Sequence, residues 1–386
     1  MATLSSKMLP AGVATLAQGA LADTSVQPND SPAFDGLTVN GNAYPSNGAL
    51  SNRNLFMNGA VQVAQRGTST AGVTAGGYYV ADRFRLNLDT QGTHTLSQAA
   101  DGPAGFAKSY KIEVTTADAA PAAGDNLGLD QRFEGQNLQM LKKGTAGAEP
   151  VTLSFWVKSN KTGTYNVEFE DITNARNIIG TYTVDVSGTW EYKTITFAGD
   201  TSGAFIADSS LRARVLWWLG SGSTFSSGTR NTSWAATVNA NRAVGNVNLA
   251  DTIGNTWQIT GVQLEVGDTA TPFGNRSFGQ ELALCQRYYE SSYPSGTSSG
   301  ASATSVRVQT GGTSGVGYLP YKASKRASPT ISFWAATNGT AGNADNGATN
   351  RPIAAATAGT YGFAFVATPT NDNETLIFNF VADAEL

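Results

Sequence analysis

The sequence has 386 residues, enough for two domains and an additional arm. Charged residues make up 14% of the chain, against roughly 25% in an average protein, and polarity comes mainly from serine, threonine, asparagine and glycine. The net charge is −4, and lysine and arginine do not cluster in the sequence. The chain therefore lacks the positively charged patch with which a protein binds the phosphates of a nucleic acid.

The chain contains one cysteine, Cys285, and one histidine, His94. A single cysteine cannot form an internal disulfide, and this pair excludes the common zinc sites and any dyad that needs a second histidine. His94 lies in the polar stretch "DTQGTHTLSQ", where we expect a surface side chain. No run of about 18 apolar residues exists, so we expect no membrane insertion.

Residues 1–50 are rich in alanine, glycine, proline, serine and asparagine. Pro28 and Pro32 interrupt any continuous helix, and a segment of this composition cannot bury enough surface to fold alone. Two interpretations are open: a secretion signal, against which Pro10 and Gly12 count, and an arm that becomes ordered on a partner. We favour the arm and predict that it anchors the chain to a larger assembly.

From Asn54 onward, apolar and polar residues alternate with a period of two, which is typical of strands with one buried face. Turn residues separate the runs, and we expect about eight to ten strands before residue 275. This pattern predicts an all-β, antiparallel β-sandwich of the jelly-roll type. The clearest runs are 151–159, 164–172, 190–200, 211–220 and 257–266.

A helix is predicted after the last of these runs, in the stretch "FGQELALCQRYY". Leu282, Cys285 and Tyr289 follow helical spacing, and Glu281 stands near the start, where the helix dipole favours negative charge. The segment is short, so packing must hold it in place. A stretch rich in serine and glycine follows at 291–305, and we expect it to give the next domain limited swing.

Short alternating runs return after residue 305 and predict a smaller C-terminal β domain. The runs 362–368 and 375–383 flank a turn-rich segment and predict a hairpin. The chain therefore divides into an N-terminal arm at 1–50, a sandwich domain at 51–292 that ends in the short helix, and a C-terminal β domain at 293–386.

Several segments in this order carry a resemblance to a known family. They are "NRNLFMNGAVQVAQRGTS" (52–69), "YYVADRFRL" (78–86), "EGQNLQMLKKGTA" (134–146), "TWEYKTITFAGDTSGAF" (189–205), "RNTSWAA" (230–236) and the stretch 257–292. Over roughly 51–292 the chain resembles tailed-phage fibre proteins of marine type. Neither terminus is covered by the resemblance.

The resemblance implies a jelly roll related to carbohydrate-binding modules, in a structural component of the phage virion that is made in the host cytoplasm. It further implies a homotrimer, in which residues 1–50 bind another virion protein and the distal end attaches to a host-surface glycan. Two alternatives stay open: a head fibre or capsid decoration protein, and a fibre-borne polysaccharide hydrolase.

The C-terminal domain is the better candidate for a receptor-binding tip. Glycan recognition needs aromatic rings for the C–H faces of sugars, together with polar groups for their hydroxyls. The candidate residues are Trp334, Tyr318, Tyr321, Tyr361, Asn343 and Asp345. An ordinary β core with asparagine-rich loops would contain the same residues. Lys322, Lys325 and Arg326 suggest either an anionic partner or, as we favour, a solvated turn.

Other residues are candidates for contacts between subunits. Trp217 and Trp218 are neighbours on one strand and must point to opposite sheet faces, so one is expected in the core and the other against solvent or another chain. Cys285 and Tyr288 lie on the helical segment, which we expect to dock near a threefold axis or onto the base of the sandwich.

We expect no catalytic residue. Glu168 and Glu170 fall on one face of a strand, about 6.6 Å apart along the backbone, which is within the range of a glycosidase pair. Like charges on an exposed strand face more often serve solubility and protect an edge.

No cofactor is expected either, apart from an optional structural calcium ion. Glu265 with Asp268, or Asp200 with Asp208, would supply the oxygen ligands that this ion prefers. The alternative is that these carboxylates cap turns.

Overall fold

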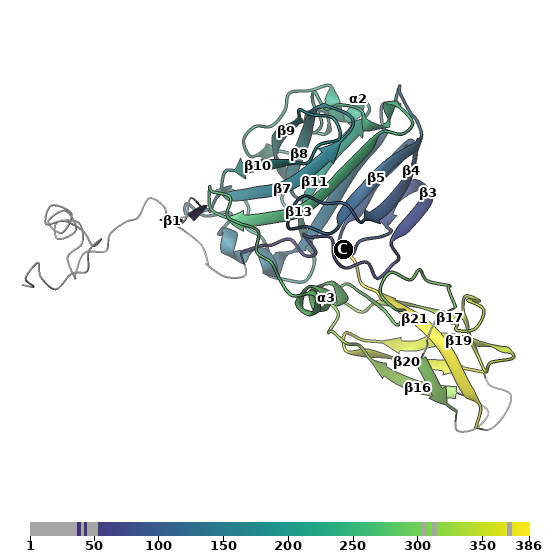
Figure 1. Ribbon diagram of the computed structural model, residues 1–386. Helices are drawn as coiled ribbons and strands as arrows, with labels where there is room; N and C mark the ends of the chain where they lie inside the picture. The colour runs from purple at the N-terminus through teal and green to yellow at the C-terminus, as the bar shows by residue number, and fades with distance from the viewer. Residues whose placement is uncertain (1–36, 40–41, 45–52, 303–305, 311–314, 369–372) are drawn as a thin grey trace, which may run out of the picture.

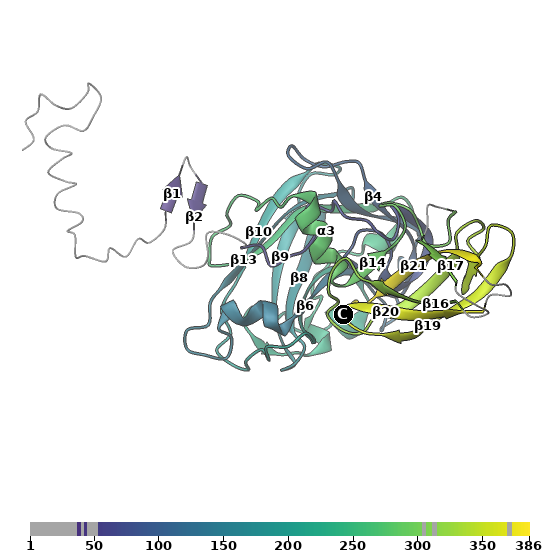
Figure 2. The same ribbon diagram turned by 90° about the horizontal axis from the view of Figure 1, so that it is seen from below.

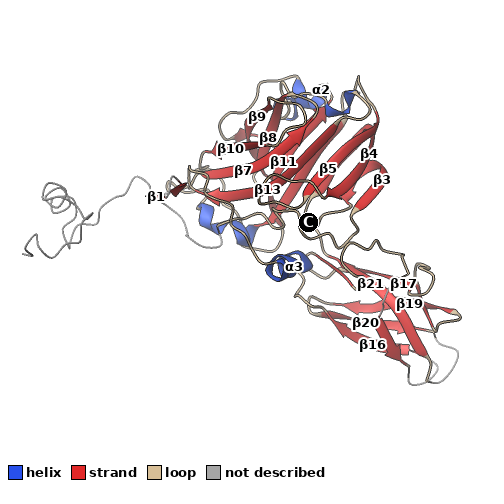
Figure 3. Cartoon of the chain, in the orientation of Figure 1, coloured by secondary structure: helices blue, strands red, loops and turns tan. Residues whose placement is uncertain are grey.

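The computed structural model describes residues 53–302, 306–310, 315–368 and 373–386, together with the backbone of two short paired strands, β1 (Leu37–Val39) and β2 (Asn42–Tyr44). The rest of the predicted N-terminal arm lies outside the described residues. Strands dominate the described chain and form a large sandwich and a smaller β domain, with one helix between them (Figure 1, Figure 3). No described helix is long and apolar enough to span a membrane.

The larger domain is an antiparallel sandwich, and β4 belongs to both of its layers. Residues Arg85–Thr90 of β4 pair with β6, whereas Thr93–Ala99 pair with β5. The change occurs where Thr90 and Gly92 adopt positive φ angles of 50° and 79°. The hydrogen-bonded order is β10-β7-β13-β5-β4-β6-β11-β8-β9-β12, with β3 on β4. The expected all-β jelly roll is therefore confirmed.

The strands of this domain follow the predicted alternating runs closely. They are β3 (Ser69–Tyr78), β4 (Arg85–Ala99), β5 (Ser109–Thr116), β6 (Asn126–Glu134), β7 (Val151–Ser159), β8 (Gly163–Asp171), β9 (Arg176–Val184), β10 (Glu191–Phe197), β11 (Leu211–Ser221), β12 (Ala235–Ala236) and β13 (Thr256–Val266). The 3-10 helix η2 (Gly135–Leu141) follows β6.

Trp217 lies in the core between the two layers and is fully buried. Its ring centroid is 5.7 Å from those of Phe56 and Phe155, which come from the N-terminal segment and from β7. Burial of such side chains contributes about 1.5–3 kcal/mol each, so this aromatic cluster is a main source of the domain's stability.

Trp218 points to the opposite sheet face, as the alternation requires, but it is also buried. In the connection between β11 and β13, α2 (Ser223–Ser226) and Ala243, just after η3 (Asn239–Asn241), cover it. The same connection also contains η4 (Leu249–Asp251), whose Leu249 joins the main core. Phe225 of α2 packs on the indole at a centroid distance of 5.2 Å. The prediction that this tryptophan faces solvent or another chain is wrong, because the chain's own connection fills that position.

Helix α3 (Phe278–Gln286) begins with a capping box formed by Ser277 and Gln280. Buried Glu281 accepts a hydrogen bond from the backbone N–H of Asn58, and Arg287 at the other end makes two hydrogen bonds to Glu134 of β6. The helix therefore rests on the base of the sandwich, which is one of the two places expected for it (Figure 2).

The smaller domain is also a sandwich, built around the central strand β21. Its strands are β14 (Tyr289–Ser291), β15 (Val306–Gln309), β16 (Gly315–Pro320), β17 (Thr330–Ala335), β18 (Asn343–Asp345), β19 (Asn350–Ala358), β20 (Gly362–Ala367) and β21 (Thr375–Asp383). One layer holds β14, β15, β17 and β18 on β21, and β19 continues from β18 into the second layer with β20 and β16.

The predicted hairpin between residues 362–368 and 375–383 is wrong. β20 pairs with β16 and β19, whereas β21 pairs with strands of the other layer. Phe365 faces Phe378 at a centroid distance of 5.1 Å, and Phe363 faces Phe380 at 4.9 Å. The two aromatic runs meet across the core instead of along a ladder, because alternate phenylalanines are needed on both inner faces.

The chain enters the second domain before the predicted boundary after residue 292, since β14 at Tyr289–Ser291 already pairs with β21. The following serine- and glycine-rich stretch packs against the first domain: the N–H of Gly296 donates to the carbonyl of Ala64. This contact ties the stretch to the first domain and does not support the expected limited swing of the second domain.

Candidate functional site

Two exposed tyrosines belong to the β19-β20-β16 layer and to the turn that leads into β20. Tyr318 of β16 has 61% of its surface exposed, and Tyr361, which directly precedes β20, has 74%. Alternation along β16 places Tyr318 outward with Val316, while Phe363 and Phe365 of the neighbouring strand fill the core. We call Tyr318 and Tyr361 the tyrosine platform.

The ring of Tyr318 lies across the neighbouring strand because Gly362 has no side chain. A Cβ atom at Gly362 would lie 2.3 Å from the hydroxyl oxygen and 2.5 Å from the Cζ atom of Tyr318, so only glycine leaves room for this arrangement. The tyrosine ring therefore rests on the backbone of Gly362, the residue that follows Tyr361 in the chain. With 61% of Tyr318 exposed, most of the side chain remains available to a ligand.

The strand segments nearest the platform are apolar. No residue of Gly315–Pro320, Ile353–Ala358 or Gly362–Ala367 carries a charge. Val316 and Val366, which pair across the two strands, are 66% and 41% exposed. Flat aromatic rings on an apolar face, with two phenol hydroxyls, suit a ligand that has apolar C–H faces and hydroxyl groups.

Tyr321 has a different environment from the platform tyrosines. It is half-buried, with its ring 5.8 Å from that of Phe363 and the Nζ atom of Lys325 4.6 Å from its centroid. Burial, together with the charge of Glu290, raises the pKa of Tyr321 to about 12. Its hydroxyl has no hydrogen-bond partner among the described residues.

The other three predicted glycan-binding residues lie elsewhere in the domain. Trp334 is half-buried and packs edge-to-face on Tyr293 at 6.3 Å. Asp345 is buried and accepts hydrogen bonds from the N–H groups of Thr337 and Gly347, so it supports a turn. Asn343 donates to the carbonyl of Ala341. The structure therefore does not bring the six predicted residues together in one site.

A second aromatic surface lies on the outer face of β7 and β10 in the first domain. The rings of Trp156 and Tyr192 lie 5.3 Å apart, and Tyr192 is 45% exposed. Sequence analysis did not single out Tyr192, although the alternation of β10 buries Ile195 and Phe197 and leaves Tyr192 outward.

The carboxylates considered for hydrolysis are neither exposed nor available. Glu168 accepts hydrogen bonds from Arg242, Asn177 and the indole N–H of Trp218. Glu170 forms ion pairs with Arg242 at 3.0 Å and Arg214 at 2.6 Å. The predicted exposed face is wrong, because the β11–β13 connection covers it. Carboxylates held this firmly between guanidinium groups are poorly placed to transfer protons or to attack a sugar.

The oxygen ligands considered for calcium are engaged by cations of the protein. The Nζ atom of Lys143 lies 2.6 Å from Asp171 and 3.0 Å from Asp200, and it donates to the carbonyls of Ser202 and Gly203 at 2.7 Å each. We call these four oxygens the lysine cage. Asp200 also pairs with Arg176, so its charge is already balanced.

The remaining calcium candidates have partners of their own. Asp208 pairs with Arg212, which lowers the pKa of its carboxyl to about 2. Glu265 accepts hydrogen bonds from Gln263 and Thr271. Within the described ranges, no group of three or more histidine, cysteine or acidic side chains is arranged to hold a metal ion.

Two further predictions of surface position are wrong. His94 is buried, with Nε2 2.8 Å from the carbonyl oxygen of Gln91, and burial lowers its pKa. Lys325 is buried in an ion pair with Glu290 at 2.6 Å, and Arg326 donates to the carbonyls of Ser209, Ala384 and Glu385. Lys325 and Arg326 obtain their partners from residues distant in sequence, whereas His94 is bonded to a carbonyl only three positions away.

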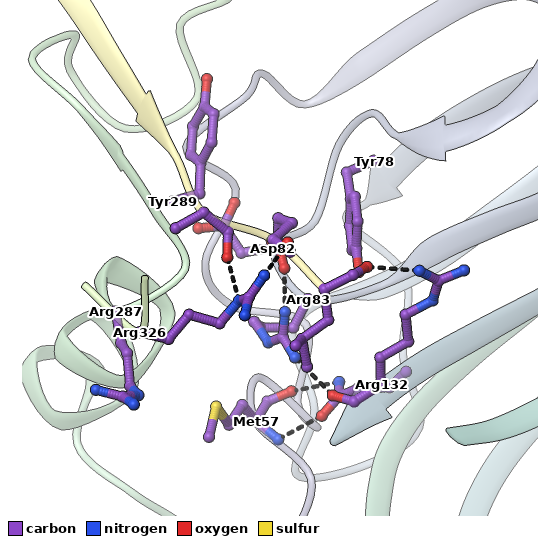
Figure 4. A network of polar contacts seen from close by, with 12 residues as sticks. Met57, Tyr78, Asp82, Arg83, Arg132, Arg287, Tyr289 and Arg326 are labelled. Carbon is purple, nitrogen blue, oxygen red and sulfur yellow. Dashed lines mark hydrogen bonds and ion pairs between the residues drawn. The ribbon is translucent and has the colours of Figure 1, made fainter. Parts of the chain in front are cut away.

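Cys285 and Tyr288, which were candidates for contacts between subunits, are buried within the chain at the joint between the two domains. Glu385 forms ion pairs there with Arg66 and Arg83 of the first domain, and Arg132 donates to the carbonyl of Leu386. Figure 4 shows this polar network, with Arg83 and Arg132 approaching from the sandwich and Arg326 from the second domain.

Comparisons with known proteins show distant structural likeness. No family model and no curated protein matches the sequence. Among solved structures, the chain is similar to the enzymatically active domain of bacteriophage CBA120 tailspike protein 4, with 13% identity, a TM-score of 0.30, and coverage of 55% of this chain and 21% of that one.

Two further solved structures are similar over a comparable share of the chain. One is a CBM4 structure, with 10% identity, a TM-score of 0.28, and coverage of 54% of this chain and 97% of the other. The other is a putative sugar binding protein from Bacteroides thetaiotaomicron VPI-5482, with 12% identity, a TM-score of 0.31, and coverage of 55% and 100%. TM-scores this low do not establish a shared overall structure.

Proposed function

We propose that this chain is a non-enzymatic structural protein of a phage virion, a tail fibre that attaches to host-surface glycans through its C-terminal domain. The observation that carries the binding function is the exposed ring of Tyr318, held over Gly362, with exposed Tyr361 next to that glycine in the chain. The virion role is supported by the resemblance of residues 51–292 to tailed-phage fibre proteins.

Binding at the tyrosine platform would depend on stacking. The electron-rich face of a tyrosine ring attracts the polarised C–H groups on the apolar face of a pyranose, and burial of both surfaces adds a hydrophobic contribution. An open surface of this kind binds weakly on its own. Several linked copies, as in a homotrimer, would raise the overall avidity by about 10² to 10⁴. We propose that residues 1–50 attach such an oligomer to another virion protein.

A glycan array with the full chain tests the binding function. We expect signal on neutral polysaccharide fragments, and a loss of that signal in Tyr361→Ala, which removes a side chain that is 74% exposed and therefore little needed for folding. Tyr192→Ala, which changes the aromatic surface of the first domain, should leave the signal unchanged. Loss of signal in Tyr192→Ala alone would place binding on the sandwich and refute the platform.

Two assays separate the alternatives. Reducing-sugar release from host polysaccharide would identify a hydrolase, whereas the pairing of Glu168 and Glu170 with arginine supports a non-enzymatic protein. Immunogold electron microscopy of phage particles would place the chain on the tail, as we propose, or on the head.

A further inference from the structure

A cleft of about 370 Å³ opens at the joint between the two domains. This volume falls within the range of roughly 300–1,000 Å³ that small-molecule sites occupy, and such sites occur preferentially between domains. The first domain contributes Gln65, helix α3 contributes Leu282 and Gln286, and the second domain contributes Lys322. The segment Ser291–Ser295 closes the remaining side.

The charge of the cleft is positive. Lys322 lines it, and no aspartate or glutamate does. The nearby carboxylate of Glu290 is satisfied by the ammonium of buried Lys325 and by the backbone N–H of Lys322. Of the three cations at 322–326, Lys325 and Arg326 are therefore engaged in contacts with other residues of the chain. The exposed side chain of Lys322 makes no ion pair among the described residues.

The rest of the lining is rich in hydrogen-bonding groups. Gln286 and Ser295 present an amide and a hydroxyl, and Tyr293 adds an aromatic ring whose hydroxyl accepts the N–H of Gly300. The amide nitrogen of Gln65 is occupied by Asp82 and by the carbonyl of Tyr289, which fixes this side chain in place. Amides, hydroxyls and one ring around a single cation are complementary to a polyhydroxylated anion.

We propose that this joint cleft binds a small sugar that carries an anionic group, a carboxylate or a phosphate, with the anion on Lys322 and the hydroxyls on Gln286, Tyr293 and Ser295. The site is separate from the tyrosine platform, which is uncharged, and its ligand would contact both domains at once. The inference goes beyond the proposed attachment function and does not require it.

Ligand-observed NMR titrations of the full chain test the site with D-glucuronate, glucose 6-phosphate, D-glucose and inorganic phosphate. We expect the two anionic sugars to bind about tenfold more tightly than glucose, which is the effect of one charged hydrogen bond. Lys322→Gln should lose this preference and Lys322→Arg should keep it. Lys108→Gln removes a lysine elsewhere and serves as the matched control. Ser295→Trp should close the cleft, since Ser295 is exposed and tolerates a larger side chain.

Equal binding of glucose and glucuronate, or unchanged binding in Lys322→Gln, would overturn the proposal. Inorganic phosphate that binds as tightly as glucose 6-phosphate would overturn the part that concerns the sugar. Tyr361→Ala should leave all four titrations unchanged. The proposals for the joint cleft and for the tyrosine platform are therefore tested independently.

Discussion

The guanidinium carbon of Arg83 lies 3.5 Å from the ring centroid of Tyr288, so a cation of the first domain stacks on a tyrosine two residues after helix α3, at the joint. Arg66 repeats the arrangement on Tyr289, at 3.6 Å. Burial opposes the charge on both arginines, yet Glu385 holds their pKa values above the ordinary value. The joint is therefore a packed interface with its own ion pairs.

Replacement of Glu385 by glutamine should destabilise this interface. Arg66 and Arg83 would stay buried without their shared partner, and removal of one member of a buried ion pair costs about 3–5 kcal/mol. Asp383→Asn is the matched control, because Asp383 is 44% exposed, lies 3.6 Å from the same Arg66, and should contribute less than about 1 kcal/mol. Hydrogen exchange of the joint amides and urea denaturation measure the effect. Equal results for the two variants would contradict the account.

The stability of the protein should fall with rising pH because of Asp82. Burial raises the pKa of this carboxyl from 3.8 to about 6, although Arg66 and hydrogen bonds from Gln65 oppose the shift. A carboxyl that binds its proton more tightly in the folded state stabilises the fold below pH 4, and this contribution is lost as the pH rises through about 6.

Denaturation of the wild type and of Asp82→Asn between pH 4 and pH 7 measures this contribution. The advantage of the wild type over the variant should shrink by about 2 kcal/mol across that range. The asparagine of the variant does not titrate, so any effect it has on the free energy of unfolding is the same at every pH and cancels in this comparison. A difference that stays constant, or that grows with pH, would show that the folded state does not hold this proton.

Lys143 should act as the cation of the lysine cage. Both Lys143→Ala and Lys143→Met remove the cation of Asp171 and leave it beside Asp200, whose remaining partner is Arg176, and should lower stability by about 3–5 kcal/mol. Alanine leaves space for an ion among the four oxygens, whereas methionine fills it. Millimolar Ca²⁺ should therefore raise the melting temperature of Lys143→Ala and leave Lys143→Met and the wild type unchanged. A calcium-stabilised wild type would instead indicate a metal site elsewhere.

The thiol of Cys285 should be unreactive in the native protein. Burial raises its pKa well above the ordinary value, with Asp82 and Glu281 adding to the effect, so almost no thiolate forms. Ellman's reagent should react at least roughly a hundredfold more slowly in buffer than in urea, since access requires opening of the joint. Cys285→Ser should fold normally and Cys285→Asp should not. Fast labelling of the native thiol would place Cys285 at an exposed surface.

The sequence was sufficient to predict features that depend on local periodicity. The alternation of β7, β8 and β11 predicted their strands, and the neighbours Trp217 and Trp218 do point to opposite faces. Periodicity says which face a residue occupies. It does not say what covers that face, and for this reason the burial of Trp218 and Glu168 under the β11–β13 connection was missed.

Contacts between residues far apart in sequence explain the other differences. The ion pair of Glu385 with Arg83 joins residues about 300 positions apart and has no local signal. The runs at 362–368 and 375–383 looked like a hairpin because both alternate, yet alternation is equally compatible with facing layers. The platform was predicted in part: Tyr318 and Tyr361 were named, but the role of Gly362 beneath the ring follows only from the strand register.

The affinity of the full chain for purified host surface polysaccharide, measured by biolayer interferometry before and after Tyr318→Ala combined with Tyr361→Ala, is the most direct test of the proposed attachment function. Each ring should contribute about 2 kcal/mol as a central aromatic contact, so the double variant should bind at least roughly a hundredfold more weakly while its melting temperature stays near that of the wild type. Unchanged affinity in a folded double variant would contradict the account.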